Sequence, residues 1–130
     1  MQILQPPGWA RPRGYSSGVL ARGRLVFVAG QIGWDAQCRF QTSDLTGQVR
    51  QALENVVAVL AQAGARPEHI ARMTWYVTDK REYIAAYPSI GVVYRQVIGA
   101  HYPVMTAVQV SALVEDQAKV EIEATAVIPD

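Results

Sequence analysis

Two alternating segments near the end of the chain constrain its fold more than any other feature. Residues 102–110 and 119–128 alternate in period two and are rich in β-branched side chains. This pattern predicts two strands whose faces differ, because successive side chains of a strand point to opposite sides of the sheet. We therefore predict two strands that each present a short row of side chains on one face, uncharged in the first strand and carboxylate-bearing in the second.

These two rows carry the residues of most chemical interest. Met105 and Ala107 alternate with the valines of the first segment, and Glu121 and Glu123 alternate with the apolar row of the second. We expect both rows to share one semi-polar sheet face, whose predicted members are Arg72, Thr74, Tyr76, Met105, Ala107, Gln109, Glu121 and Glu123. Such a face is too mixed for a dry core and too apolar for a purely solvated surface, which favours self-association with ligand grooves between subunits.

The other predicted elements follow from hydrophobic periodicity and turn residues. Residues 15–21 and 24–29 predict a hairpin, and because residues 25–29 are all apolar we expect that strand to be covered on both faces. Further along, helices are predicted at residues 44–64 and 88–99, with a strand between them at residues 69–78. The predicted fold is a single α+β domain over residues 1–130, a mixed sheet with two helices on one face, preceded by an irregular arm at residues 1–14.

Composition narrows the classes of function. With 130 residues and a net charge of +1 the chain has room for one domain and no excess of basic residues, so nothing favours nucleic acid as a partner. No apolar run approaches a membrane span and residues 1–13 lack the apolar core of a signal peptide, so we expect a cytoplasmic protein without a membrane partner. Cys38 is the single cysteine, and with only His69 and His101 beside it no metal-ligand spacing can be assembled.

An ordered set of segments gives the chain a resemblance to a known family. It resembles the reactive intermediate deaminase family, also called Rid, YjgF or L-PSP, in the segments Gly14-Tyr15-Ser16, Leu25–Ile32, Gln48–Gly64, Thr74–Asp79, Tyr94, Pro103–Val110 and Val120–Val127. The resemblance implies a chorismate-mutase-like fold and a homotrimer whose sheets line a central barrel, with small-molecule clefts at the subunit interfaces. It also implies hydrolysis of enamine or imine intermediates to 2-keto acids and ammonia, with no metal or cofactor.

The resemblance also implies roles for particular positions. Tyr15 would shape the cleft, and Glu121 would help to position the attacking water. Archetypal members carry Ser, Arg and Cys where this chain has Ala29, Met105 and Ala107, and their Arg clamps the substrate carboxylate. A few residues are also inserted before the second helix, near the rim of the expected cleft.

Met105 changes the expected ligand. Methionine supplies neither the charge nor the paired donors of an arginine, and a charge-assisted hydrogen bond is worth about 1.5–3 kcal/mol. Its loss should weaken carboxylate binding at least about ten-fold, and Glu121 would disfavour an anion further. A neutral or cationic, more apolar ligand fits Met105 and Ala107 better. Without the resemblance, Tyr15 could be a simple edge-strand aromatic and Met105 core filler.

Other candidates have a structural interpretation beside the functional one. Glu121 and Glu123 lie roughly 6.5 Å apart along a strand, which suits an acid/base pair but also an ordinary solvated or interface-paired face. Arg72 could supply the missing cation in the cleft, or it could pair with one of these carboxylates. Ser16 lies in a G-x-S-x-G match, but Pro12 precedes it and a strand follows, so the strand–turn–helix context of a nucleophile elbow is absent.

Three functions remain open from the sequence. The first is a cofactor-independent enamine or imine deaminase-type hydrolase in which Glu121 orients water. The second is a non-catalytic ligand-binding or interaction trimer, which the combined loss of Arg, Ser and Cys favours. The third is the endoribonuclease activity attached to some relatives, which the near-neutral charge and the lack of a histidine pair disfavour.

Overall fold

The computed structural model describes residues 1–130, which have a mixed α+β fold. Its strands are β1 Gln2–Leu4, β2 Gly18–Leu20, β3 Arg24–Ile32, β4 Ile70–Val77, β5 Val104–Gln109 and β6 Val120–Ile128. Its helices are α1 Leu45–Ala61, α2 Lys80–Ala85 and α3 Tyr87–Val97, with a 3₁₀ turn at Pro67–His69. The main sheet has the order β3-β6-β4-β5, with β4 and β5 parallel and the other pairs antiparallel.

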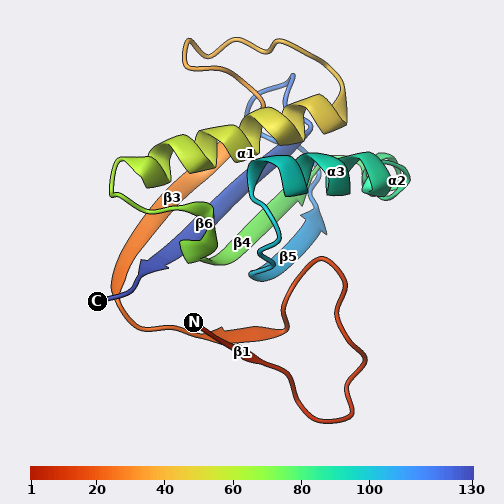
Figure 1. The fold of residues 1–130 in the computed structure, drawn as a ribbon. Helices are drawn as coiled ribbons and strands as arrows, with labels where there is room; N and C mark the ends of the chain where they lie inside the picture. Colours follow the sequence, from red (N-terminus) through yellow and green to blue (C-terminus); the bar gives the residue numbers. More distant parts are fainter.

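The helices cover one face of this sheet and leave the other face open (Figure 1). The core lies between the helices and the sheet, where Trp75, Met73, Leu53 and Ile122 are almost completely buried. The predicted class, a mixed sheet with its helices on one face, is confirmed.

Helix α1 forms where the apolar stripe predicts it, because its stripe is the face that meets the sheet. Leu45, Val49, Ala52, Leu53, Val56 and Leu60 are all buried. The side chain of Asp44 caps the helix by accepting the backbone N–H of Gly47 at 2.9 Å. Past the last turn, Gly64 adopts a φ of 71°, the left-handed conformation that commonly ends a helix.

The predicted hairpin between residues 15–21 and 24–29 is wrong. Strand β2 pairs with β1, and β3 pairs with β6. Gly23 explains the difference, because it has a φ of 149° and any Cβ there would lie 2.0 Å from the carbonyl oxygen of Ile128. The chain therefore runs past Gly23 alongside the end of β6 instead of turning back. The arm at residues 1–14 is accordingly not wholly irregular, since it contains β1, and it projects away from the main sheet (Figure 1).

The second predicted helix, at residues 88–99, is present as α3, and the structure adds a short helix, α2, that was not predicted. Pro88 lies in the first turn of α3, as expected, but α2 occupies the inserted residues before it. Asp79 starts α2 by accepting the backbone N–H groups of Arg81 and Glu82 at 2.9 and 3.2 Å. The short helix therefore adds its side chains to the rim beside β5.

The open sheet face differs from its prediction. Strand β3 was expected to be covered on both faces, yet Leu25 is 58% exposed and Phe27 73% exposed in the single chain. The reason is that all the helices of the main layer pack against the other side. None of the helices is long and apolar enough to cross a membrane.

Candidate functional site

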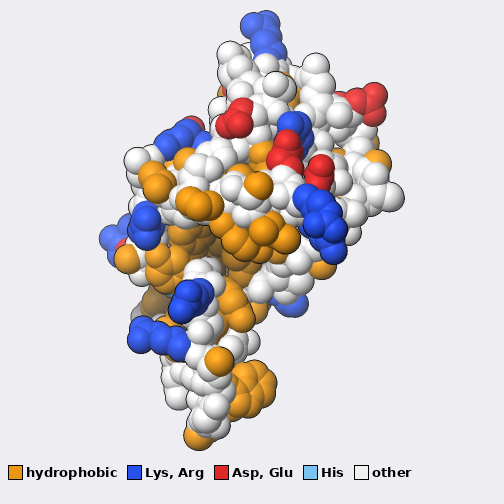
Figure 2. Space-filling model, turned by 90° about the vertical axis from the view of Figure 1, so that its right-hand side faces the viewer, with side chains coloured by type: hydrophobic (Ala, Val, Ile, Leu, Met, Phe, Trp, Pro, Cys, Tyr) orange, Lys and Arg blue, Asp and Glu red, His pale blue; other side chains and the backbone are white.

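A groove lined mainly by hydrophobic side chains, several of them aromatic, runs between β5 and the α2–α3 pair. Its volume is about 720 Å³, within the range of about 300–1,000 Å³ typical of small-molecule sites. We call it the tyrosine groove and define it by Trp75, Tyr83, Tyr87, Tyr94, Tyr102 and Met105. Figure 2 shows this side of the molecule, with hydrophobic side chains gathered in a hollowed patch and Lys and Arg side chains around it.

The register of β5 against β4 decides which row of β5 faces the groove. In this parallel pair Met105 lies beside Met73, and Ala107 lies beside Trp75. Both Met73 and Trp75 are core residues on the helix side of the sheet. Met105, Ala107 and Gln109 therefore lie on the helix side of the sheet, and all of them line the groove. The prediction that they share a face with Arg72 and Glu121 is wrong. Strand β5 is at an edge of the sheet, so the helices cover its helix-facing side only partly. Its valines could therefore lie on the open face instead of in the core.

Tyr15 reaches the groove because the chain around it is tied to the start of β5. The backbone N–H of Ser16 donates to the carbonyl of Pro103 at 3.0 Å, and the Ser16 hydroxyl donates to the carbonyl of Tyr102 at 2.6 Å. Gly14, with a φ of 77°, supplies the turn before it. Ser16 is buried and its hydroxyl is engaged, so this segment positions Tyr15 and does not present a nucleophile.

The aromatic rings of the groove support one another. Tyr94 stacks on Tyr102 with ring centroids 5.6 Å apart, and Tyr83 meets Tyr87 edge-on at 5.1 Å and Trp75 at 6.2 Å. Burial raises the pKa of Tyr83 to about 12 and also raises the pKa of Tyr94. Both hydroxyls therefore stay neutral near pH 7, and that of Tyr94 donates to the carbonyl of His101 at 2.6 Å.

A second group of predicted residues lies on β3 and β6, toward the sheet edge opposite β5. We call it the Glu121 edge and define it by Ala29, Gly30 and Glu121 on β3 and β6. The carboxylate of Glu121 lies directly over Gly30, where a Cβ would come within 2.1 Å of Oε2. Ala29 is exposed beside it. The close approach requires glycine at position 30 if Glu121 is to keep this orientation.

The structure brings Tyr15, Met105 and Ala107 together and keeps them apart from Ala29 and Glu121. Strands β6 and β5 are separated by β4, so their axes lie roughly 10 Å apart. Glu121 also belongs to the open face, since it alternates with the buried Val120 and Ile122 and pairs with Tyr76. A single chain therefore holds two separate parts of the site that the sequence predicted.

The open face also decides the roles of Glu123 and Arg72. Tyr76 donates its hydroxyl to Glu123 at 2.7 Å, and this hydrogen bond raises the pKa of Tyr76. The expected ion pair between Arg72 and a carboxylate of β6 is absent, because the tyrosine takes that place. Arg72 lies on the open face with Glu123, so it does not supply a cation to the groove beside Met105.

Several groove residues were not among the site residues that the sequence predicted. Tyr83, Tyr87 and Tyr94 recur at helical spacings of four and seven residues, a signal that could have marked one wall. Arg13, Lys80 and Arg95 also line the groove, and no local pattern could have placed them there, because they come from three separate segments. No group of three or more His, Cys, Asp or Glu side chains is placed to hold a metal ion.

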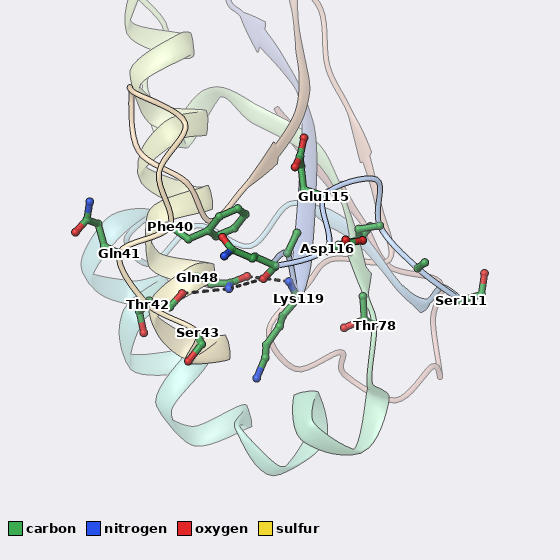
Figure 3. A pocket seen from close by; sticks show the side chains of 14 residues that line it. Phe40, Gln41, Thr42, Ser43, Gln48, Thr78, Ser111, Glu115, Asp116 and Lys119 are labelled. Atoms are coloured by element: carbon green, nitrogen blue, oxygen red, sulfur yellow. Dashed lines mark hydrogen bonds between the residues drawn. The ribbon is translucent and has the colours of Figure 1, made fainter.

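A second cavity, of about 700 Å³, lies between the loop before α1 and the loop before β6 (Figure 3). At its base Gln48 is fully buried, and its amide N–H groups donate to the carbonyls of Thr42 and Gln117 at 3.2 and 3.0 Å. Its Oε1 accepts the backbone N–H of Lys119 at 2.8 Å. Every polar atom of Gln48 is thus used to join the two loops, so Gln48 is a structural residue.

Comparison with known proteins identifies the family. The family model described as endoribonuclease L-PSP matches residues 9–128. The chain belongs to this family, the Rid proteins. It is 38% identical to TdcF of Escherichia coli K12 over 130 residues, which cover 98% of this chain and 95% of TdcF. It is 32% identical to the 2-iminobutanoate/2-iminopropanoate deaminase of Salmonella typhimurium over 108 residues, covering 81% of this chain and 80% of that enzyme.

Solved structures of Rid proteins share the fold. The Rid family protein YyfB from Yersinia pestis, whose function is unknown, superposes with a TM-score of 0.86 at 30% identity, covering 98% of both chains. The structure of E. coli TdcF with bound serine gives a TM-score of 0.70 at 36% identity, covering 98% of this chain and 99% of TdcF. The recognition made from the ordered segments is confirmed, and a Rid-like small-molecule function is supported.

Proposed function

We propose that this Rid protein is a homotrimer that hydrolyses an enamine or imine in a site made by two chains. The tyrosine groove of one copy would hold the substrate, and the Glu121 edge of the next copy would supply the carboxylate that orients water. The observation that carries the proposal is the separation of these two groups on one chain: they lie on different strands and on opposite faces of the sheet. A second copy is the simplest source of the missing part.

The exposed apolar residues of the open face support self-association. Phe27 and Leu25 of β3 are large, apolar and more than half exposed, and both lie on the sheet. Burying such side chains typically contributes about 1.5–3 kcal/mol each. A partner that covers this face would also give β3 the two-sided burial that its sequence predicts.

The chemistry proposed for the site needs no metal or cofactor. An enamine first tautomerises to its imine, and water then adds across the C=N bond. The carbon–nitrogen bond of the resulting carbinolamine breaks, which leaves a ketone and ammonia. Glu121 would accept a proton from the attacking water and return it to the departing nitrogen, a general acid–base role typically worth about 10²–10⁴-fold in rate.

Mixing two inactive variants tests the shared site. Glu121→Gln removes the carboxylate, and Ala107→Trp fills the groove of its own chain. If each site combines two chains, refolding the variants together should restore activity to about one quarter of the sites by random mixing. The assay follows ammonia release from 2-iminobutanoate generated in situ, and light scattering gives the mass of the assembly. A monomer, or mixtures no more active than either variant alone, would contradict the proposal.

A non-catalytic ligand-binding trimer is the second candidate. The specific observation in its favour is that Met105 and Ala107 line the groove and Ala29 the other edge, where archetypal Rid enzymes carry functional polar side chains. A wild-type protein that binds a ligand in the groove without turnover, and whose binding survives Glu121→Gln, would decide for this function. The endoribonuclease description of the family is not favoured for this chain, because its net charge is only +1.

A further inference from the structure

We propose that the tyrosine groove binds an acid with an aromatic or branched apolar body, and that Arg13 and Arg95 hold its carboxylate at the end of the groove beside Met105. The inference rests on the groove used in the proposed function, but it does not depend on hydrolysis. It also replaces the expectation of a neutral or cationic ligand that Met105, Ala107 and Glu121 had favoured.

The charge of the groove is the first observation. In the single chain its charged lining residues are Arg13, Lys80 and Arg95, and no Asp or Glu of the same chain lines it. None of the three cations is in an ion pair, since the ion pairs of the chain involve Arg22, Arg50, Arg66 and Lys119. Unpaired cations around an apolar hollow are complementary to a ligand with an apolar body and an anionic end.

The placement of the cations selects one end of the groove. Arg13 comes just before the segment that Ser16 ties to Pro103, at the start of β5. Arg95 follows Tyr94, whose ring stacks on Tyr102 next to the same end. Met105 is the second residue of β5. The two arginines therefore lie toward the end where the archetypal family arginine is replaced.

Lys80 lies toward the opposite end. Its backbone N–H donates to the side chain of Gln109 at 2.8 Å, at the end of β5. Gln109 lies four positions after Met105, which corresponds to about 13 Å along a strand. The backbone of Lys80 thus lies at the opposite end of the groove from Met105, where its ammonium is available to a polar group at the distal end of a longer ligand.

The middle of the groove suits an apolar body. Tyr83 and Tyr87 line it with rings, and Met105 adds a flexible thioether at the adjoining end. The volume of about 720 Å³ exceeds what a short 2-imino acid needs. Beneath these side chains Trp75 is only 1% exposed, and its indole N–H has no acceptor in the protein. Tyr83 packs against this ring, so a ligand that shifts Tyr83 changes the environment of Trp75 and can be detected by its fluorescence.

Binding of 3-phenylpropanoate to the intact protein tests the inference. Trp75 is the reporter in a variant that also carries Trp9→Phe and Trp34→Phe, and calorimetry repeats the measurement on the wild type. We expect 3-phenylpropanoate to bind at least about ten-fold more tightly than its amide, because the amide lacks the charge. Propanoate should also bind at least about ten-fold more weakly, because it lacks the apolar body.

Matched variants locate the anion. Arg13→Gln and Arg95→Gln should each weaken 3-phenylpropanoate binding about ten-fold and leave amide binding unchanged. Arg81→Gln is the control, since Arg81 is exposed next to Lys80 but does not line the groove; it should change the affinity by less than about two-fold.

Equal binding of acid and amide, no binding of either, or insensitivity to both arginine variants would overturn the inference. Because the acid is not hydrolysed, binding without ammonia release from any imine would overturn only the proposed catalysis. If the protein hydrolyses an imine but binds 3-phenylpropanoate no more tightly than its amide, only the proposed role of Arg13 and Arg95 would be overturned.

Discussion

Gln48 offers the sharpest test of how the fold is held together, because one buried amide joins two loops. Replacing it with Met keeps a similar side-chain volume and a similar helix propensity, but it removes the hydrogen bonds to Thr42, Gln117 and Lys119. Each lost bond costs about 0.5–1.5 kcal/mol. Some of the freed backbone groups can reach water through the adjacent cavity, so we expect Gln48→Met to lower the free energy of unfolding by about 2–4 kcal/mol.

Urea unfolding followed by circular dichroism measures this loss. With a slope of about 2 kcal/mol per M, the midpoint should fall by about 1–2 M. Gln51→Met is the matched control, because Gln51 lies three residues further along the same helix and makes a single, partly buried hydrogen bond to Asn55. Its midpoint should move by less than about 0.5 M. Equal shifts for the two variants would refute the reasoning, since they would show that the joined loops contribute nothing to stability.

Three further predictions concern two glycines, the open face and the pH dependence of stability. Gly33→Ala should destabilise the fold by about 1–3 kcal/mol, because its Cβ would meet Cα and Cβ of Gln48 at 2.8 and 2.6 Å. Gly30→Ala should instead leave the urea midpoint nearly unchanged but abolish the proposed imine hydrolysis, because its Cβ would displace only the outer atoms of the Glu121 side chain. Equal midpoints for the two variants would contradict this contrast. If the proposed trimer forms through the open face, Phe27→Glu should reduce it to smaller species in light scattering without unfolding the chain. An unchanged assembly would show that the open face is not the interface. Stability should fall as pH rises from about 10 to 12, because the unfolded chain loses the Tyr83 proton near pH 10 while the folded chain holds it until about 12; unfolding measured across this range should show a shallower fall for Tyr83→Phe.

Local patterns predicted much of the fold because they depend on local geometry. The stripe of α1 and the alternation of β4, β5 and β6 follow from helix and strand periodicity, and Pro88 marks the start of α3 correctly. The hairpin failed because Gly23 is determined by the approach of Ile128, which lies more than one hundred residues away in the sequence. A turn signal cannot report a contact with a distant backbone.

The two terminal strands show which properties the sequence predicts and which depend on tertiary packing. Alternation determines that Met105 and Ala107 share one face and that Glu121 and Glu123 share another, since the strand backbone imposes it. Which of these faces meets the helices depends on the parallel register of β5 and on how far the helix layer extends. Both are properties of distant segments packed together. Only the tertiary structure could therefore place Met105 in an aromatic groove with Arg13 and Arg95, and Glu121 on the opposite side of the sheet.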